Sequence, residues 1–205
     1  MLAGQKIDLT GCNYGFQRRT GVFINKPLSY YYFLAGFVRS QYLSYILELG
    51  THFGGSIMSM SKGLNEESIP KSRLVTVDQD MENIEGFKEY PHIIRIQGRI
   101  LDPDILHKVI GQFDRPIDLL FIDSSHKYEH VKEVLDLYAH MLKPRFIILD
   151  DIFLNDPMKE LWLKITEEFG ERAFDATQVS RRGKGDSIGF GVINFNKIVA
   201  NETPC

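Results

Sequence analysis

The chain has 205 residues, of which 43% are apolar, 25% are charged and 12% are aromatic. These fractions are typical of a folded globular protein and exclude a disordered or fibrous chain. The formal net charge of -3 provides no overall attraction to nucleic acid or to an anionic membrane surface. We therefore expect a single domain over residues 1–205, with a lead-in and helix in residues 1–44 and a core in residues 45–205.

The two cysteines, Cys12 and Cys205, lie near opposite ends of the sequence, which is typical of a reduced protein rather than a disulfide scaffold. The longest apolar runs are far shorter than the ~20 residues that cross a bilayer, and the N-terminus has no signal-peptide pattern. We expect a cytoplasmic protein with no membrane or nucleic-acid partner. The oligomeric state stays open, a homo-oligomer included.

Residues 1–26 contain scattered glycines and polar residues, which predict an irregular lead-in. After Pro27, aromatic and aliphatic residues recur at helical spacing and predict an amphipathic helix over residues 28–42. We expect this helix to cover part of a ligand pocket.

From residue 45 onward, short apolar runs alternate with helical patterns. The predicted strands are 45–49, 74–77, 93–96, 118–122 and 146–149, and the predicted helices are 56–64, 80–88, 103–111, 128–142 and 155–169. Two further strands are predicted at 174–179 and 188–195, and the eight residues SRRGKGDS between them are too few for a helical crossover. The pattern predicts an α/β fold with a doubly wound, seven-stranded, mostly parallel sheet whose last strand is antiparallel.

A glycine-containing turn follows the first predicted strand, in the segment from Glu48 to Ser56 (ELGTHFGGS). In a doubly wound sheet this turn lies where nucleotide-like ligands bind, and glycine lets the backbone approach them closely. The next strand ends at Asp78, where an acid can accept hydrogen bonds from ribose hydroxyls. The alternatives are a turn that needs glycine only for packing and an Asp78 that caps a helix or faces solvent. The spacing does not match G-x-G-x-x-G, which disfavours a dinucleotide site.

Three acids follow the fourth and fifth predicted strands: Asp123 after the fourth, and Asp150 with Asp151 after the fifth. Because these strands are expected to be neighbours, the acids should meet at one edge of the sheet, where Mg²⁺ would relieve their repulsion. His126 is the candidate general base, since its ordinary pKa of ~6.5 suits proton removal near neutral pH. Lys127 is a weaker candidate because an exposed lysine stays protonated. Helix capping by the acids is the alternative for each residue taken singly.

These motifs resemble a known family. Glu48-Leu49-Gly50 followed by Val77-Asp78 resembles class I S-adenosylmethionine-dependent methyltransferases. Asp123-x-x-His126 with Asp150-Asp151 resembles their metal-dependent small-molecule O-methyltransferases, of the macrolide-sugar and cephalosporin-hydroxylase-like type. Where that family commonly has a Gly-Gly pair after Lys143-Pro144, this chain has Arg145-Phe146.

The resemblance implies a Rossmann-like methyltransferase fold and methyl transfer from S-adenosylmethionine to a hydroxyl of a small-molecule acceptor, assisted by Mg²⁺. It implies that Gly50 and the turn at residues 54–56 lie beside the methionine part of the cofactor, Asp78 beside the ribose and Gly98 beside the adenine. The expected catalytic residue is His126 and the expected metal ligands are Asp123, Asp150 and Asp151. The expected cofactor-binding residues are Glu48, Gly50, Thr51, Gly54, Gly55, Ser56, Asp78, Gly98 and Asp123.

Two other functions remain open from the sequence: an NAD-linked oxidoreductase on a similar sheet, and a non-catalytic cofactor-binding subunit. The basic pairs Arg18-Arg19 and Arg181-Arg182 could hold an anionic acceptor, although solvated loop charge is the more common role of such pairs. The other histidines share no metal-ligand spacing, which disfavours zinc.

Overall fold

The computed structural model describes residues 6–10, 16–17, 22–23, 29–81, 85–180 and 189–195. The strands are β1 (Phe16–Gln17), β2 (Val22–Phe23), β3 (Tyr45–Leu49), β4 (Arg73–Asp78), β5 (Ile93–Gln97), β6 (Leu119–Ile122), β7 (Phe146–Asp150), β8 (Ala173–Asp175) and β9 (Phe190–Asn194). The α-helices are α2 (Ser29–Gln41), α3 (Gly55–Gly63), α4 (Pro103–Ile110), α5 (Tyr128–Leu142), α6 (Asp156–Phe169) and α7 (Thr177–Ser180). The 3-10 helices are η1 (Glu66–Lys71), η2 (Gly86–Glu89) and η3 (Gly170–Arg172).

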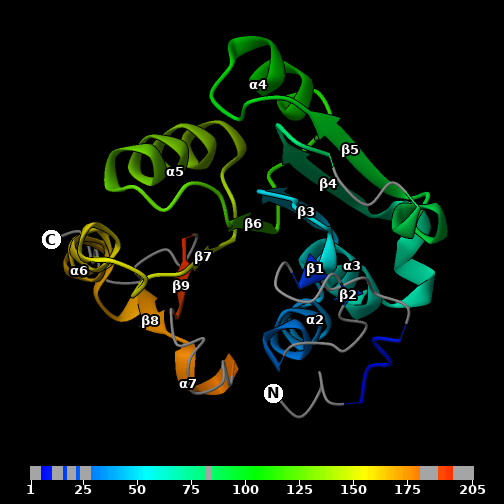
Figure 1. Cartoon of the computed structure of the whole chain (residues 1–205), viewed down its shortest axis with the longest axis horizontal. Coiled ribbons are helices and arrows are strands. Elements are labelled where there is room, and N and C mark those ends of the chain that lie inside the picture. Colours follow the sequence, from blue (N-terminus) through cyan, green and yellow to red (C-terminus); the bar gives the residue numbers. More distant parts are fainter. Residues whose placement is uncertain are drawn as a thin grey trace, which may run out of the picture.

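The central sheet has seven strands in the order β5-β4-β3-β6-β7-β9-β8 (Figure 1). Strands β5, β4, β3, β6 and β7 are mutually parallel, and β9 is antiparallel to both of its neighbours. The chain moves outward from β3 to β5 and then returns to place β6 on the other side of β3. Such a reversal of strand order creates a crevice at the carboxyl ends of the strands. The predicted fold class is confirmed.

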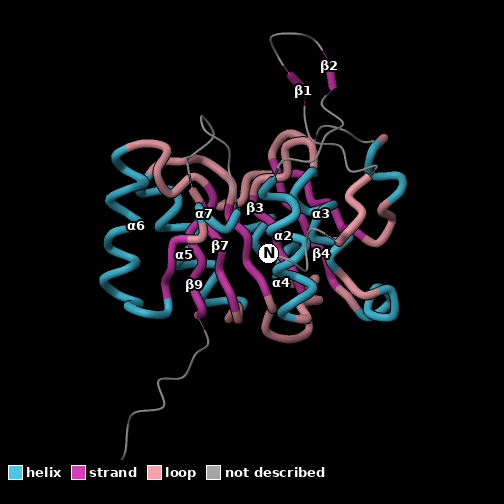
Figure 2. The backbone as a smooth tube through the Cα atoms, turned by 90° about the horizontal axis from the view of Figure 1, so that it is seen from below, coloured by secondary structure: helices cyan, strands magenta, loops and turns pink. Residues whose placement is uncertain are grey.

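Alternating side chains along the strands form a separate core on each face of the sheet. Ile46 of β3 and Phe121 of β6 belong to the core covered by α2 and α3, whereas Leu47 and Leu120 belong to the core covered by α4, α5 and α6. Figure 1 shows these two groups of helices on opposite sides of the sheet, and Figure 2 views the molecule from the side of α2 and α7. Because both faces are covered, the parallel strands are mostly apolar, and the polar side chains buried in them include Glu48 and Thr76.

Helices α2 and α3 pack closely because a glycine lies at their contact. A Cβ atom on Gly63 would lie 2.4 Å from the carbonyl oxygen of Ala35, so only glycine allows this approach. Arg39 of α2 donates hydrogen bonds to the carbonyl oxygens of Gly63 and Leu64, at 3.2 Å each. These carbonyls at the end of α3 are thereby satisfied by a neighbouring helix.

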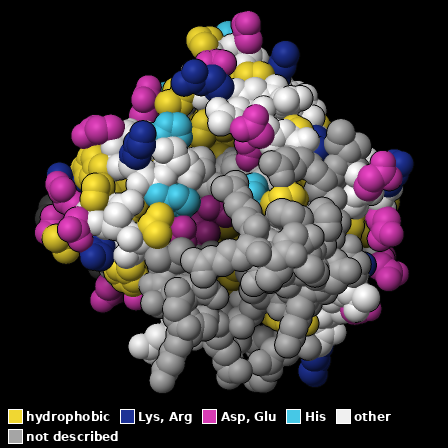
Figure 3. Space-filling view, viewed as in Figure 1, with side chains coloured by type: hydrophobic (Ala, Val, Ile, Leu, Met, Phe, Trp, Pro, Cys, Tyr) yellow, Lys and Arg dark blue, Asp and Glu magenta, His cyan; other side chains and the backbone are white. Residues whose placement is uncertain are grey.

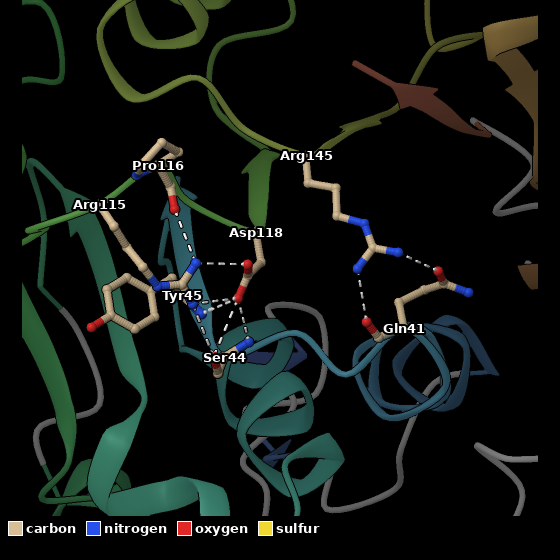
Figure 4. A network of polar contacts seen from close by, with 7 residues as sticks. All are labelled: Gln41, Ser44, Tyr45, Arg115, Pro116, Asp118 and Arg145. Carbon is tan, nitrogen blue, oxygen red and sulfur yellow. Dashed lines mark hydrogen bonds and ion pairs between the residues drawn. The ribbon is translucent and has the colours of Figure 1, made fainter. Parts of the chain in front are cut away.

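A polar network holds the amino-terminal ends of β3, β6 and β7, at the end of the sheet away from the crevice (Figure 4). Asp118 accepts hydrogen bonds from the backbone N–H groups of Ser44 and Tyr45, both at 2.8 Å, and from the guanidinium of Arg115. Burial would raise the pKa of Asp118, but the hydrogen bonds from Arg115 and the two backbone groups hold it below its usual value. Arg145 donates to the carbonyl and side-chain oxygens of Gln41, and thereby fixes the end of α2 against β7.

Two predicted elements are wrong. In place of the helix at 80–88, the described residues form a bend after β4 and only the short η2; residues 82–84 lie outside the described part. The reason is that Asp78 accepts a hydrogen bond from the N–H of Asp80, which turns the chain. In place of a strand at 174–179, β8 ends at Asp175 and α7 follows, because the Asp175 carboxylate accepts from the N–H of Thr177 at 2.8 Å.

The predicted antiparallel pairing of the last two strands is confirmed, although β9 is shorter than predicted and begins at Phe190. The irregular lead-in prediction is wrong for two short segments, since β1 and β2 form an antiparallel pair. Strands of two residues show no alternation that a sequence could reveal. In the described part of the chain, no helix has the length and apolar character needed to span a membrane.

Candidate active site

The turn after β3 brings three strand ends together. Gly50 has a φ of +104°, and its N–H donates to the carbonyl of Val77 at 2.9 Å. A Cβ atom on Gly50 would lie 1.7 Å from the backbone carbonyl oxygen of Asp123. Glycine is therefore required here for both its backbone conformation and its close contact with the end of β6.

The turn after β3 is supported by the buried acid Glu48. Glu48 is fully buried and accepts hydrogen bonds from the hydroxyls of Ser56 and Thr76, the second at 2.5 Å. Burial raises the pKa of Glu48 to about 8, although both hydroxyl groups oppose the rise. Thr51 is also buried, and its hydroxyl lies 2.5 Å from that of Thr76. These side chains connect β3, β4 and the start of α3.

Asp78, at the end of β4, holds the same turn from the side. Its Oδ2 accepts hydrogen bonds from the N–H groups of Thr51 and His52, at 2.8 and 2.9 Å, and its Oδ1 accepts from Asp80 at 3.1 Å. A carboxylate has about four acceptor positions. The three backbone groups leave Asp78 able to accept a further hydrogen bond from a ligand.

A cavity of about 560 Å³ lies at the carboxyl ends of β3, β4, β5 and β6. Its volume is within the range of small-molecule sites. Four of the predicted cofactor-binding residues line it: Gly50, Asp78, Gly98 and Asp123. The other five, Glu48, Thr51, Gly54, Gly55 and Ser56, form or support the turn at its edge, and their contact with a cofactor stays a prediction.

The predicted acid and histidine cluster comes together beside this cavity. Nε2 of His126 lies 3.6 Å from Oδ1 of Asp123 and 3.3 Å from Oδ2 of Asp151. Asp150 and Asp151 are only 3% and 7% exposed, and Oδ1 of Asp150 accepts the N–H of Asp151 at 2.8 Å. Figure 3 shows acidic side chains deep in a hollow of this face, with histidine atoms near its edge. The four residues therefore meet at one edge of the sheet, with Asp123 shared between cluster and cavity.

The donor set of this cluster suits a hard cation in kind, because Mg²⁺ prefers carboxylate oxygens. Among the described residues, however, no group of three or more His, Cys, Asp or Glu side chains is arranged as a metal site. The assignment of Asp123, Asp150 and Asp151 as metal ligands stays a prediction.

Aromatic side chains flank the acids. Tyr30, at the start of α2, lies 4.3 Å from Tyr31 and 5.5 Å from Phe190 between ring centroids, and Phe190 is the register partner of Asp150. Burial raises the pKa of both tyrosines, and the nearby Asp123 and Asp150 add to the rise. The start of α2 thus lies beside the acid cluster, but no described residue of α2 lines the cavity, and a cover over the pocket stays a prediction.

Several cavity residues were not predicted as ligand contacts: Val77, Gln79, Arg99, Ile100, Leu101, Ser124, Ser125, Lys127 and His130. His130 lies in the first turn of α5, with Nε2 3.5 Å from the Ser124 hydroxyl, and burial lowers its pKa. No spacing in the sequence relates it to His126, which lies in the loop before α5. The basic residues Arg18, Arg19, Arg181 and Arg182 lie outside the described part of the chain.

Comparisons with known proteins agree with this fold. A family model described as a methyltransferase domain matches residues 47–152. A search of the curated proteins gives no match.

Among solved structures, an O-methyltransferase from Bacillus cereus in complex with SAH is 20% identical, with 79% of each chain covered and a TM-score of 0.58. The O-methyltransferase TomG from Streptomyces achromogenes, involved in tomaymycin synthesis and in complex with SAM, is 17% identical, with 80% of this chain and 78% of that chain covered and a TM-score of 0.58. The SAH-bound methyltransferase PaMTH1 from Podospora anserina is 16% identical, with 80% and 77% covered and a TM-score of 0.54. At these identities the similarity supports the fold.

Proposed function

Because the chain belongs to the methyltransferase-domain family, we propose that it transfers a methyl group from S-adenosylmethionine to a hydroxyl of a small-molecule acceptor, with the help of Mg²⁺. One observation carries the proposal: the cavity and the His126 cluster share Asp123, so a ligand in the cavity adjoins a base flanked by carboxylates. The family match favours methyl transfer over the hydride transfer of an NAD-linked enzyme.

The residues around the cavity suit the proposed cofactor. Asp78 keeps an acceptor position for a ribose hydroxyl, and Gly50 and Gly98, which carry no side chain, also line the cavity. The turn is held rigidly by the buried Glu48 and its hydroxyl partners. A preformed turn reduces the conformational entropy that is lost on binding.

The residues that would hold Mg²⁺ are Asp123, Asp150 and Asp151, whose oxygens are of the kind that this cation prefers. A bound Mg²⁺ supplies Lewis acidity, which lowers the pKa of an acceptor hydroxyl. Asp150 and Asp151 are held in place by the end of β7 and by the hydrogen bond between them.

In the proposed reaction, the imidazole of His126 accepts the proton of the acceptor hydroxyl while the hydroxyl oxygen attacks the methyl carbon of the sulfonium. The O–C bond forms, the S–C bond breaks with its electron pair going to sulfur, and the products are a methyl ether and S-adenosylhomocysteine. The carboxylates of Asp123 and Asp151 stabilise the imidazolium that results. Lys127 is exposed and lines the cavity, and it is not needed as the base.

The acceptor is a small molecule in this proposal, since the net charge of -3 does not favour a nucleic-acid or membrane partner. The half-buried ring of Tyr30, which lies near Asp123 and Asp150, provides an apolar surface for an acceptor in this proposal. A cytoplasmic location and a homo-oligomeric assembly are untested predictions.

Calorimetry tests cofactor choice. S-adenosylmethionine, S-adenosylhomocysteine and NAD are each titrated into the protein with and without EDTA. We expect binding of the first two and none of NAD; tight binding of NAD with no response to S-adenosylmethionine would overturn the proposal.

Turnover is then followed as release of S-adenosylhomocysteine, with 1,2-dihydroxybenzene and methyl α-glucoside as phenolic and sugar acceptors. His126→Ala should keep the affinity for S-adenosylhomocysteine and lower turnover by ~10²–10⁴-fold, the usual range for a lost general base. Unchanged turnover would remove His126 from the reaction. Cofactor binding by a protein that gives no turnover with any hydroxyl compound would favour the non-catalytic subunit.

A further inference from the structure

The oxygen and the nitrogen of the Asn155 side-chain amide form hydrogen bonds with two different parts of the molecule. Its Oδ1 accepts the N–H of Met158 at 2.9 Å, which makes Asn155 the N-cap of α6. Its Nδ2 donates to the backbone carbonyl oxygen of His126 at 3.0 Å, across 29 positions of the sequence. The cap alone explains an asparagine, aspartate or serine at this position, but only the second bond requires the amide nitrogen.

The second bond joins the two loops that carry the acid and histidine cluster. His126 lies in the loop between β6 and α5, and Asp151 begins the loop between β7 and α6. The N–H of Leu154 donates to the carbonyl of Asp151 at 3.0 Å, which forms a turn that leads directly to Asn155. His126 is therefore held to the Asp151 loop twice, through its backbone carbonyl and through its imidazole.

These contacts form a closed ring. It runs from Asp151 through the turn to Asn155, from there to the backbone of His126, and through the imidazole back to the Asp151 carboxylate at 3.3 Å. Without the amide donor the ring is open, and of its two bonds between the loops only the imidazole contact with Asp151 remains. Displacements of about 1 Å at a catalytic group can lower rates by ~10²-fold.

We propose that Asn155 is a positioning residue for His126, which sets the distance between the imidazole and Asp151 through its hydrogen bond to the His126 carbonyl. This proposal depends on the proposed function, in which His126 is the base. Asn155 has a second role as the cap of α6, which contributes to stability and can be separated from the positioning role.

Two substitutions separate these roles. Asn155→Ser keeps an oxygen that can cap α6 but has no group that reaches the His126 carbonyl, and Asn155→Ala loses both interactions. We expect both variants to lower kcat about ten-fold or more with 1,2-dihydroxybenzene or methyl α-glucoside, while KM for S-adenosylmethionine stays unchanged. Asn155→Ala should have a Tm ~2–4 °C below that of Asn155→Ser, because both variants lose the bond to His126 and the lost cap costs about 1 kcal/mol more.

A spectroscopic measurement gives a result that does not depend on turnover. The imidazole Cε1–Hε1 signal of His126 is followed by NMR at one fixed pH and is assigned by its loss in His126→Gln. The signal should move by the same amount in both Asn155 variants. An unmoved signal and a wild-type kcat in Asn155→Ser would overturn the proposal, as would a loss of kcat confined to Asn155→Ala and proportional to its loss of stability.

The variant His126→Gln distinguishes this inference from the proposed function. If His126→Gln lowers kcat and Asn155→Ser does not, the positioning role alone is wrong. If His126→Gln leaves kcat unchanged, the proposed role of His126 as base is wrong, whatever the Asn155 variants show.

Discussion

Replacing Gly50 with alanine should disturb the site through the backbone of Asp123 rather than through any lost contact. The new Cβ would lie 1.7 Å from the Asp123 carbonyl oxygen, whereas ordinary van der Waals contact begins at 3.4 Å. The two backbones must therefore separate by roughly the difference, 3.4 − 1.7 = 1.7 Å. The φ of +104° adds a conformational cost of ~1–3 kcal/mol for a residue with a side chain.

We expect Gly50→Ala to weaken binding of S-adenosylhomocysteine by at least ten-fold, equivalent to ~1.4 kcal/mol, because Gly50 and Asp123 both line the cavity. Turnover should fall by ~10²-fold further, since Asp123 also contacts His126. Calorimetry measures the first effect, and thermal unfolding measures the loss of stability.

Gly170→Ala is the matched control. Gly170 also has a positive φ, +54°, but a Cβ atom there would have nothing within 4 Å. This variant should lose only the conformational cost of ~1–3 kcal/mol that its backbone angles impose on a residue with a side chain, and it should bind S-adenosylhomocysteine as the wild type does. The reasoning is refuted if Gly50→Ala binds this ligand with unchanged affinity and loses no more stability than Gly170→Ala.

Three further predictions concern pH and metal. The pKa of Glu48 is raised to about 8 in the folded protein, so its contribution to stability is complete below its unfolded pKa of about 4.5 and is lost as the pH rises to 8. Over that range the free energy of unfolding should fall by up to ~1.4 kcal/mol per pH unit, and Tm should fall with it. Glu48→Gln should make the pH dependence of Tm shallower. Because the pKa of Asp118 is lowered in the folded protein, its contribution to stability is present above its unfolded pKa and is lost as the pH falls through its folded pKa. Asp118→Asn should lower the free energy of unfolding, measured in urea at pH 7, by ~1–3 kcal/mol. Equal stability of the variant and the wild type at that pH would contradict this prediction. EDTA should abolish turnover, and added Mg²⁺ should restore it. EDTA should change the affinity for S-adenosylhomocysteine by less than about two-fold, because Asp123 is the one proposed metal ligand that lines the cavity. Turnover that persists in EDTA would exclude a role for the metal.

The sheet could be predicted because apolar runs and helical periodicities are properties of neighbouring residues. The carboxyl ends of parallel strands necessarily share one edge, so the meeting of Asp123 with Asp151 also followed from the order of the strands. The mistaken helix at 80–88 has a different origin. A single hydrogen bond between Asp78 and the N–H of Asp80 turns the chain there, and periodicity does not detect such a bond.

Contacts between loops were beyond prediction for a related reason. Asn155 was expected only to begin a helix, and nothing in the sequence relates it to His126, which lies 29 positions earlier. Similarly, Arg145 in place of a glycine gave no sign of its partner, yet it joins β7 to the end of α2. Such pairings depend on the fold as a whole, so they can be identified only from the structure.

The position of β9 inside the sheet has a consequence for synthesis of the protein on the ribosome. This strand lies between β7 and β8, although it follows the other described strands in the sequence. Until it emerges, the apolar edge of β7 is left open, and Asp151 lacks the carbonyl of Gly189 to which its N–H donates at 2.9 Å. A nascent chain that stops before Gly189 therefore lacks one contact of the acid cluster and exposes a strand edge that favours aggregation, so the site should be complete only after β9 has left the ribosome.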